Sequence, residues 1–94
     1  MIKSIIENEK ICFICDSESG LHRHHVFHGT ANRKLSEQYG CWVWLCPRHH
    51  NMSKEGVHYN AGLDLRIKQI AQERWEEVYG NRKDFIRIFG KSYL

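Results

Sequence analysis

The 94-residue sequence contains a single proline, Pro47, and it lacks internal repeats, low-complexity segments and long apolar runs. Because a membrane-spanning helix needs about 20 consecutive apolar residues, the sequence predicts no such helix. The segment MIKSIIENEK at residues 1–10 carries charges throughout and lacks the apolar centre of a signal peptide. We therefore expect a cytoplasmic protein with no membrane partner.

The excess of positive charge is small. There are 14 Lys and Arg residues against 11 Asp and Glu residues, which leaves a formal net charge of +3. This charge is compatible with nucleic-acid binding but falls short of a strongly basic surface. A chain of this length forms one domain, residues 1–94, with a modest core that often needs a metal or a disulfide to support it. In a cytoplasmic protein the four cysteines more often bind metal than form disulfides.

Two short motifs have the spacing of metal ligands, CFIC at 12–15 and CPRH at 46–49. Zinc prefers four tetrahedral nitrogen and sulfur ligands in closed structural sites, and two motifs supply that number. We therefore predict a structural zinc bound by Cys12, Cys15, Cys46 and His49. Cys41 is five residues from Cys46 across an apolar segment, roughly 16 Å at the rise of a strand. We expect Cys41 to be a thiol of the core rather than a ligand.

Histidine is over-represented, with seven in the chain and four within HRHHVFH at 22–28. Neighbouring side chains on a strand point to opposite faces, so one ion should not bind both His24 and His25. Adjacent helical residues point about 100° apart, which separates His49 from His50 in the same way. We therefore expect one ligand and one free base in the first pair, with His25 transferring a proton. The ligand of that pair, His24, would bind a second divalent ion together with His50 and His58.

This division suits the hydrolysis of phosphodiester bonds. An imidazole can accept the proton of an attacking water near neutral pH. A divalent ion stabilises the negative charge that develops on the phosphate and on the leaving oxygen, and three protein ligands leave coordination positions open. Three imidazoles suit Zn²⁺, Ni²⁺, Co²⁺ or Mn²⁺ better than Mg²⁺, and the identity of the second ion stays open among these divalent metals.

The hydrophobic pattern predicts an α+β fold. Residues 21–27 and the apolar segment CWVWL at 41–45 are expected to form two antiparallel strands. Residues 28–40 are mostly polar, and we expect a loop with at most one helical turn there. Trp42 and Trp44 are expected to pack rather than to stack on bases.

The C-terminal part, residues 60–94, is predicted to contain two helices. Apolar residues of the first helix recur on one face: Leu63, Ile67, Ile70, Ala71, Trp75 and Val78. Asn60 is a predicted N-cap and Gly80 a predicted residue at the C-terminal end. A capping box of Asn81 and Asp84 begins the second helix, and Gly90 ends it. Three residues of this helix are expected to pack inward: Phe85, Ile86 and Phe89.

Together, the CFIC motif, His-His-Val at 24–26 and VWLCPRHHN at 43–51 resemble the HNH endonucleases, the ββα-metal nucleases. The match spans residues 12–58. The resemblance implies a treble-clef-like, zinc-stapled ββα-metal core, formed by a hairpin and a helix, followed by the two C-terminal helices. The last ten residues, FIRIFGKSYL, also resemble the ends of small HNH-like proteins of phages that infect Gram-positive bacteria. This likeness implies a bacterial host cytoplasm and phage DNA-processing partners.

The resemblance also implies a role for individual residues. His24 would bind the catalytic ion, His25 would be the general base, and His50 would be a ligand from the helix. The activity implied is metal-dependent cleavage of DNA, with RNA as another possible substrate. Phosphate contacts are expected from loop residues near the site: Arg33, Lys34 and His28. The alternative is a zinc module without catalytic activity that binds nucleic acid or a protein.

The sequence departs from the family where an asparagine usually orients the base histidine, because Cys41 occupies that place. Asn32 or Asn51 are candidates to substitute for it. The backbone alone is the third alternative for positioning His25.

A second departure concerns the helix ligands. Many relatives have two helix histidines four residues apart, but four residues after His50 is Lys54. His58 is eight residues away, about 12 Å along a continuous helix, so it joins His50 only if the helix breaks between them. We favour His58, while Asn51 or Glu55 would supply an oxygen ligand if the helix continues.

Overall fold

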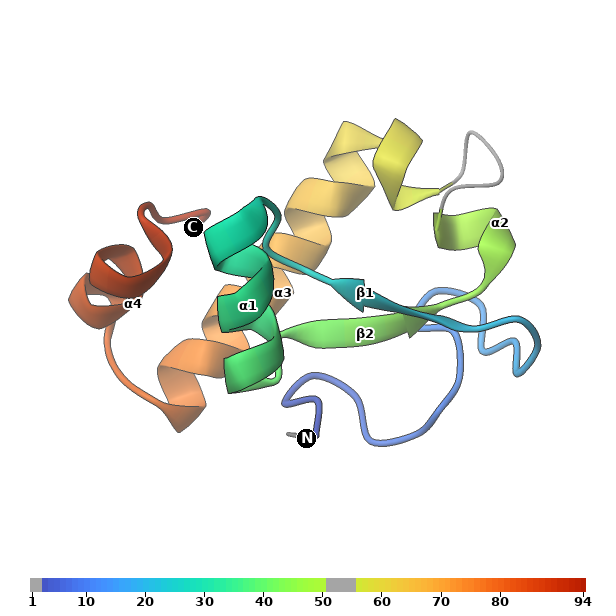
Figure 1. Cartoon of the computed structure of the whole chain (residues 1–94), viewed down its shortest axis with the longest axis horizontal. Coiled ribbons are helices and arrows are strands. Elements are labelled where there is room, and N and C mark those ends of the chain that lie inside the picture. The colour runs from blue at the N-terminus through green and yellow to red at the C-terminus, as the bar shows by residue number, and fades with distance from the viewer. Residues whose placement is uncertain (1–2, 51–55) are drawn as a thin grey trace.

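The computed structural model describes residues 3–50 and 56–94 and has a small α+β fold (Figure 1). Its elements follow the order β1 (His22–His25), α1 (Thr30–Tyr39), β2 (Trp42–Leu45), α2 (Pro47–His50), the 3₁₀ helix η1 (Val57–Tyr59), α3 (Ala61–Val78) and α4 (Arg82–Phe89). Residues 3–21 contain no helix or strand. No helix in the described ranges has the length and apolar character needed to cross a membrane.

The two strands pair in an antiparallel arrangement, as the sequence predicts. His24 lies opposite Val43 and His25 lies opposite Trp42. Because side chains alternate across a strand, His24 shares a face with Val43, which is fully buried. His25 shares the other face with Trp42. The sheet thus directs the two adjacent histidines to different surroundings.

The connection between the strands differs from the prediction, because most of 28–40 forms the ten-residue helix α1 rather than a loop. Leu35 and Tyr39 pack partly buried against the core. Between them the buried Ser36 accepts a hydrogen bond from the Phe27 N–H (3.1 Å) and donates one to the Phe27 carbonyl (3.2 Å). The inner face of α1 therefore combines two apolar side chains with the polar Ser36, and so few apolar residues within a mostly polar segment do not predict a helix of this length.

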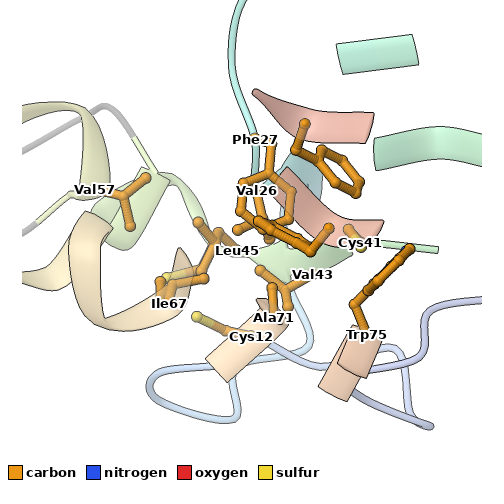
Figure 2. Packing of buried hydrophobic residues seen from close by; sticks show 13 residues of the cluster. Cys12, Val26, Phe27, Cys41, Val43, Leu45, Val57, Ile67, Ala71 and Trp75 are labelled. Atoms are coloured by element: carbon orange, nitrogen blue, oxygen red, sulfur yellow. The ribbon is translucent and has the colours of Figure 1, made fainter. Parts of the chain in front are cut away.

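The core lies between the sheet and α3, and α4 closes it at one end (Figures 1 and 2). Figure 2 shows Leu45 and Val43 of β2 facing Ile67 and Ala71 of α3. Next to them, Phe27 and Phe85 meet edge to face with ring centroids 5.3 Å apart. Burying such apolar surface contributes about 25 cal/mol per Å², so this layer holds β1 and β2 in place beneath the site.

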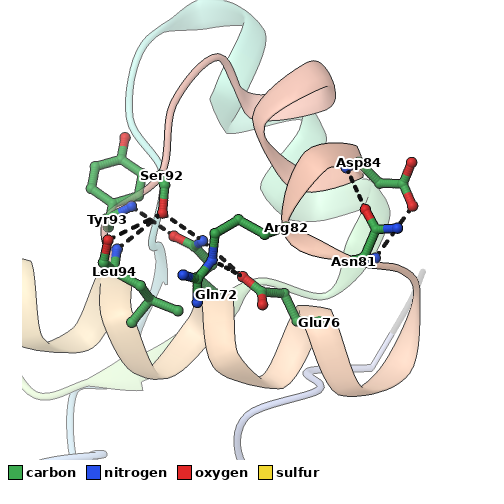
Figure 3. Close-up of polar contacts among 8 residues, drawn as sticks. All are labelled: Gln72, Glu76, Asn81, Arg82, Asp84, Ser92, Tyr93 and Leu94. Atoms are coloured by element: carbon green, nitrogen blue, oxygen red, sulfur yellow. Dashed lines mark hydrogen bonds and ion pairs between the residues drawn. The ribbon is translucent and has the colours of Figure 1, made fainter.

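The ends of the two C-terminal helices follow the predicted capping residues. Asn60 accepts a hydrogen bond from the Leu63 N–H (3.0 Å) at the start of α3. Asn81 and Asp84 form the reciprocal capping box of α4 (Figure 3). Gly80 follows α3, and a Cβ there would lie 2.8 Å from the Asp84 carboxylate. A close approach, rather than a positive φ, therefore requires glycine at this position.

One of the three packing residues predicted for α4 is exposed. Phe85 and Phe89, four residues apart, are buried, whereas Ile86 is 40% exposed. Because consecutive helical residues point about 100° apart, Ile86 turns away from the face that packs. Ile88 lies partly buried against the core instead.

The C-terminal segment is bound to α3 through the buried side chain of Gln72 (Figure 3). Its amide donates a hydrogen bond to Ser92 Oγ (3.0 Å) and accepts one from the Tyr93 N–H (2.7 Å). Burying an amide is unfavourable unless its polar atoms are paired. The Gln72 contacts thus fix the segment that follows α4 against α3.

Candidate metal centres

Cys12, Cys15, Cys46 and His49 lie together in the structure, as the sequence predicts. Cys12 and Cys15 precede β1, Cys46 follows β2, and His49 belongs to α2. The Cys15 and Cys46 sulfurs are 3.7 Å apart, and His49 Nδ1 lies 3.3 Å from Cys46 Sγ and 3.8 Å from Cys12 Sγ. A tetrahedral zinc site requires about 3.8 Å between two sulfurs and about 3.6 Å between sulfur and nitrogen. The four side chains could therefore hold a metal such as zinc.

Hydrogen bonding favours the thiolate form of one of these ligands. Burial raises the pKa of the Cys12 thiol, but hydrogen bonds from the backbone N–H groups of Cys46, Cys15 and Ile14 outweigh it and bring the pKa to about 7. Zinc binds the thiolate rather than the thiol. The turn that follows Cys12 therefore prepares the ligand near neutral pH.

Cys41 belongs to the core, as predicted. It is fully buried, and burial raises the pKa of its thiol to about 12. It stands apart from the groups of described side chains that could bind a metal. A neutral buried thiol of this kind acts as a small apolar side chain.

His24, His50 and His58 also converge, with their ligand atoms within 4.8 Å of one another. Although His50 and His58 are eight residues apart in the sequence, their Nε2 atoms lie 3.1 Å apart. Two nitrogens of a tetrahedral site would lie about 3.3 Å apart. His24 is 3% exposed, and its Nε2 is buried without a hydrogen-bond partner in the described ranges. Asn51 and Glu55, the alternative ligands, lie outside the described residues.

The surroundings keep two of these imidazoles neutral. Burial, and then the neighbouring imidazoles of His28, His50 and His58, lower the pKa of His24 to about 3. Burial, and then His58 and His22, lower the pKa of His50 to about 4. A neutral imidazole retains a lone pair for a cation. The cluster can therefore bind a divalent ion without first losing protons from these two rings.

His25 contacts a carboxylate that the sequence analysis did not identify. Its Nε2 lies 2.7 Å from Oε2 of Glu37 in α1, and Arg23 Nη1 lies 2.5 Å from the other oxygen of the same carboxylate. His25, the predicted base, thus contacts Glu37 through Nε2, and Nδ1 is its other ring nitrogen. Asn32, one suggested substitute for the missing asparagine, donates a hydrogen bond to the Phe89 carbonyl (3.2 Å) instead. Asn51 lies outside the described residues.

An open cleft of about 1020 Å³ runs along β1 and α1, and both His24 and His25 line it. Arg33 and Lys34 line the same cleft from the helix α1 rather than from the predicted loop. His28 also lines it, and its Nε2 lies 3.0 Å from Asp64 Oδ1. The three predicted phosphate contacts therefore border the space that both histidines face.

No family model, curated protein or solved structure matches this chain. The proposed function therefore rests on the geometry of the two clusters and on the sequence motifs. Both clusters depend on α2, since His49 and His50 are adjacent in that four-residue helix.

Proposed function

We propose that this protein is a metal-dependent endonuclease of the HNH type that hydrolyses phosphodiester bonds of DNA. One observation carries the proposal: two adjacent histidines of β1 enter different surroundings that border one cleft. His24 joins the imidazoles of His50 and His58, while His25 meets the carboxylate of Glu37. A cation site beside a carboxylate-held imidazole is what hydrolysis of a phosphodiester needs.

The Cys12, Cys15, Cys46 and His49 cluster has a structural role in this proposal. Four protein ligands fill a tetrahedral zinc shell and leave no position for substrate. The cluster joins the segment before β1 to α2, which follows β2. The order strand, strand, helix supports the treble-clef-like ββα-metal core that the sequence motifs imply, with α1 as an additional helix between the strands.

The second cluster would hold the catalytic ion on His24, His50 and His58. When bound, a divalent ion there supplies positive charge that stabilises the phosphate oxygens and the leaving oxygen. The buried and neutral His24 has its Nε2 available for this purpose. Three ligands leave the open positions that substrate and water require.

His25 would act as the general base through Nδ1. Its Nε2–H donates to Glu37, which places the proton of the neutral ring on Nε2 and leaves the Nδ1 lone pair to take a proton from water. The carboxylate also stabilises the imidazolium that then forms. Arg23 holds the opposite oxygen of Glu37 and fixes its orientation. Glu37 thus serves as the positioning residue where relatives have an asparagine.

Substrate binding would rest on charge rather than on base recognition. Arg33 and Lys34 border the cleft from α1, and cationic side chains bind phosphates without reading sequence. A domain this small has little surface for a long recognition site. We therefore propose low intrinsic sequence specificity and action in the cytoplasm of a bacterial host, with phage DNA-processing proteins as partners.

The test is cleavage by a His25→Ala variant. The variant should bind both metals and DNA but nick supercoiled plasmid about 10²- to 10⁴-fold more slowly, the usual contribution of a general base. Lys83→Ala changes an exposed side chain of α4 that does not line the cleft and is the control. Nicking by His25→Ala at the parent's rate would refute the role of His25. Parallel assays on RNA decide the nucleic acid.

The competing function is a zinc module without catalytic activity. The cluster of Cys12, Cys15, Cys46 and His49 favours this function, because its geometry alone fits a closed structural site. Elemental analysis of the purified protein separates the two. Two bound ions per chain support the nuclease. A stoichiometry of one ion per chain, even after addition of excess divalent metal, supports the module.

A further inference from the structure

The buried nitrogen of His24 faces a second possible ligand set on the side of α3. Besides His50 and His58, the ligand atoms of His28 and Asp64 lie within 4.8 Å of that of His24 and of one another. His24 Nε2 is buried and unpartnered among the described residues. Two groups of candidate ligands thus share one imidazole, and they differ in chemistry because only the second contains an oxygen.

Asp64 is ionised and held in place. It lies in the first turn of α3, where Lys68 Nζ contacts Oδ2 at 2.8 Å and His28 Nε2 contacts Oδ1 at 3.0 Å. Burial raises the pKa of Asp64, but the contacts with His28 and Lys68 outweigh it and lower the pKa to about 2. Its carboxylate is therefore negatively charged at any pH at which the protein would work. Nothing in the sequence motifs indicates this residue, because it lies 36 positions after His28.

We propose that His24, His28 and Asp64 form an alternative, oxygen-containing ligand set for a divalent ion, and that this set raises the affinity for Mn²⁺ relative to Zn²⁺. The inference rests on the cation site of the proposed function. Both groups include the imidazole of His24, so an ion bound with His28 and Asp64 would compete with one bound with His50 and His58. The all-imidazole set favours Zn²⁺, whereas the set with a carboxylate suits the harder Mn²⁺.

The location of the carboxylate supports this assignment. A buried, unpartnered imidazole nitrogen leaves a polar group without compensation, and a cation would satisfy it. Asp64 adds the negative charge that an all-histidine site lacks. Its second oxygen stays paired with Lys68, so Oδ1 exchanges the contact with His28 for a contact with the ion.

The experiment measures metal binding without nucleic acid, on the whole chain with its structural zinc in place. Binding of Mn²⁺ is followed by the loss of the free-ion paramagnetic resonance signal, and binding of Zn²⁺ by competition with a chromophoric chelator. The variants are Asp64→Asn, His28→Ala and His58→Ala. Glu73→Gln removes an exposed carboxylate from the same helix and is the control. Circular dichroism confirms that each variant is folded, and His28→Ala, at a half-exposed side chain, provides the test if Asp64→Asn does not fold.

The expected result is a change in selectivity. Asp64→Asn and His28→Ala should each weaken Mn²⁺ binding at least about tenfold, the order seen when a metal site loses a supporting group, while Zn²⁺ binding changes little. His58→Ala should weaken Zn²⁺ binding more than Mn²⁺ binding.

Three outcomes would overturn the inference. Equal losses for both metals in Asp64→Asn would show that the carboxylate does not change the preference between Mn²⁺ and Zn²⁺. Unchanged binding, or a parent that binds Zn²⁺ but no Mn²⁺, would also refute it while leaving the proposed nuclease intact. Failure of the parent to bind any second ion would instead refute the cation site of the proposed function.

Discussion

Removal of zinc from Cys12, Cys15, Cys46 and His49 should unfold the domain. A domain of 94 residues has a free energy of unfolding of about 5 to 14 kcal/mol, at about 0.05 to 0.15 kcal/mol per residue. Structural zinc contributes about 10 to 16 kcal/mol in small metal-dependent domains. Because the second quantity equals or exceeds the first, the metal-free chain should have little or no stability left.

The structure shows why the remaining contacts do not compensate for the metal. Residues 3–21 contain no helix or strand, and α2 has four residues, far fewer than the 12 to 15 or so that an isolated helix needs. Residues 3–21 also contact β2 directly, for example through the Phe13 N–H and the Trp44 carbonyl (2.8 Å). A hydrogen bond of this kind contributes only about 0.5 to 1.5 kcal/mol net, far less than the metal would. The expected product of zinc removal is therefore an unfolded domain.

The assay is thermal unfolding followed by circular dichroism, with and without a strong zinc chelator. Cys46→Ala and Cys41→Ala form a matched pair, since each removes one buried cysteine. Only Cys46→Ala should lose zinc and melt at low temperature. Cys41→Ala should retain zinc and the chelator response of the parent. A melting curve that does not change after complete removal of zinc would refute the reasoning.

Three further predictions concern the site and the scaffold. Glu37→Gln should lower the nicking rate about 10- to 100-fold without changing metal content, and Glu37→Asp should recover part of it; equal rates would contradict the positioning role. Calorimetry at pH 6 in buffers of different ionisation enthalpy should show almost no proton release from His24 and His50 when the second ion binds, because their pKa values of about 3 and 4 leave them neutral. Two imidazoles with the usual pKa of about 6.5 would release about 1.5 protons at pH 6. A measured release of two or more protons per ion bound would therefore contradict the prediction that His24 and His50 are already neutral. Asn81→Ala should destabilise the protein by about 1 kcal/mol in urea titrations, the usual cost of a lost N-cap, and an unchanged midpoint would argue against the capping box.

What could be predicted from sequence depended on how local the interaction is. The two cysteine motifs and the capping box of Asn81 and Asp84 each join residues three apart, so spacing alone identifies them. His50 and His58 meet although they are eight residues apart, and the sequence favours this contact without fixing it. Contacts that depend on the place of a whole helix were missed. Glu37 reaches His25 only because residues 30–39 are helical.

The helix α1 itself was missed for a physical reason. Its inner face carries Ser36 and Asn32, which hydrogen-bond to the backbone of Phe27 and Phe89. The larger apolar residues of this helix are only Leu35 and Tyr39, which pack against the core four positions apart, so the helical pattern is too short to distinguish the segment from a polar loop. Gly40, with φ of 74°, ends the helix in the left-handed conformation that favours glycine. That one signal marks the end of the helix but not its length.

The two metal clusters are physically linked through α2. His49 belongs to the cysteine cluster and the adjacent His50 to the histidine cluster, and a four-residue helix is too short to hold an orientation by itself. A zinc ion bound by Cys46 and His49 would therefore set the direction of the His50 ring. Coupling between two binding sites is reciprocal: if zinc in the cysteine cluster strengthens the binding of an ion at His50, that ion strengthens zinc binding by the same factor. In the proposed function, zinc in the cysteine cluster would thus determine whether the catalytic site can form.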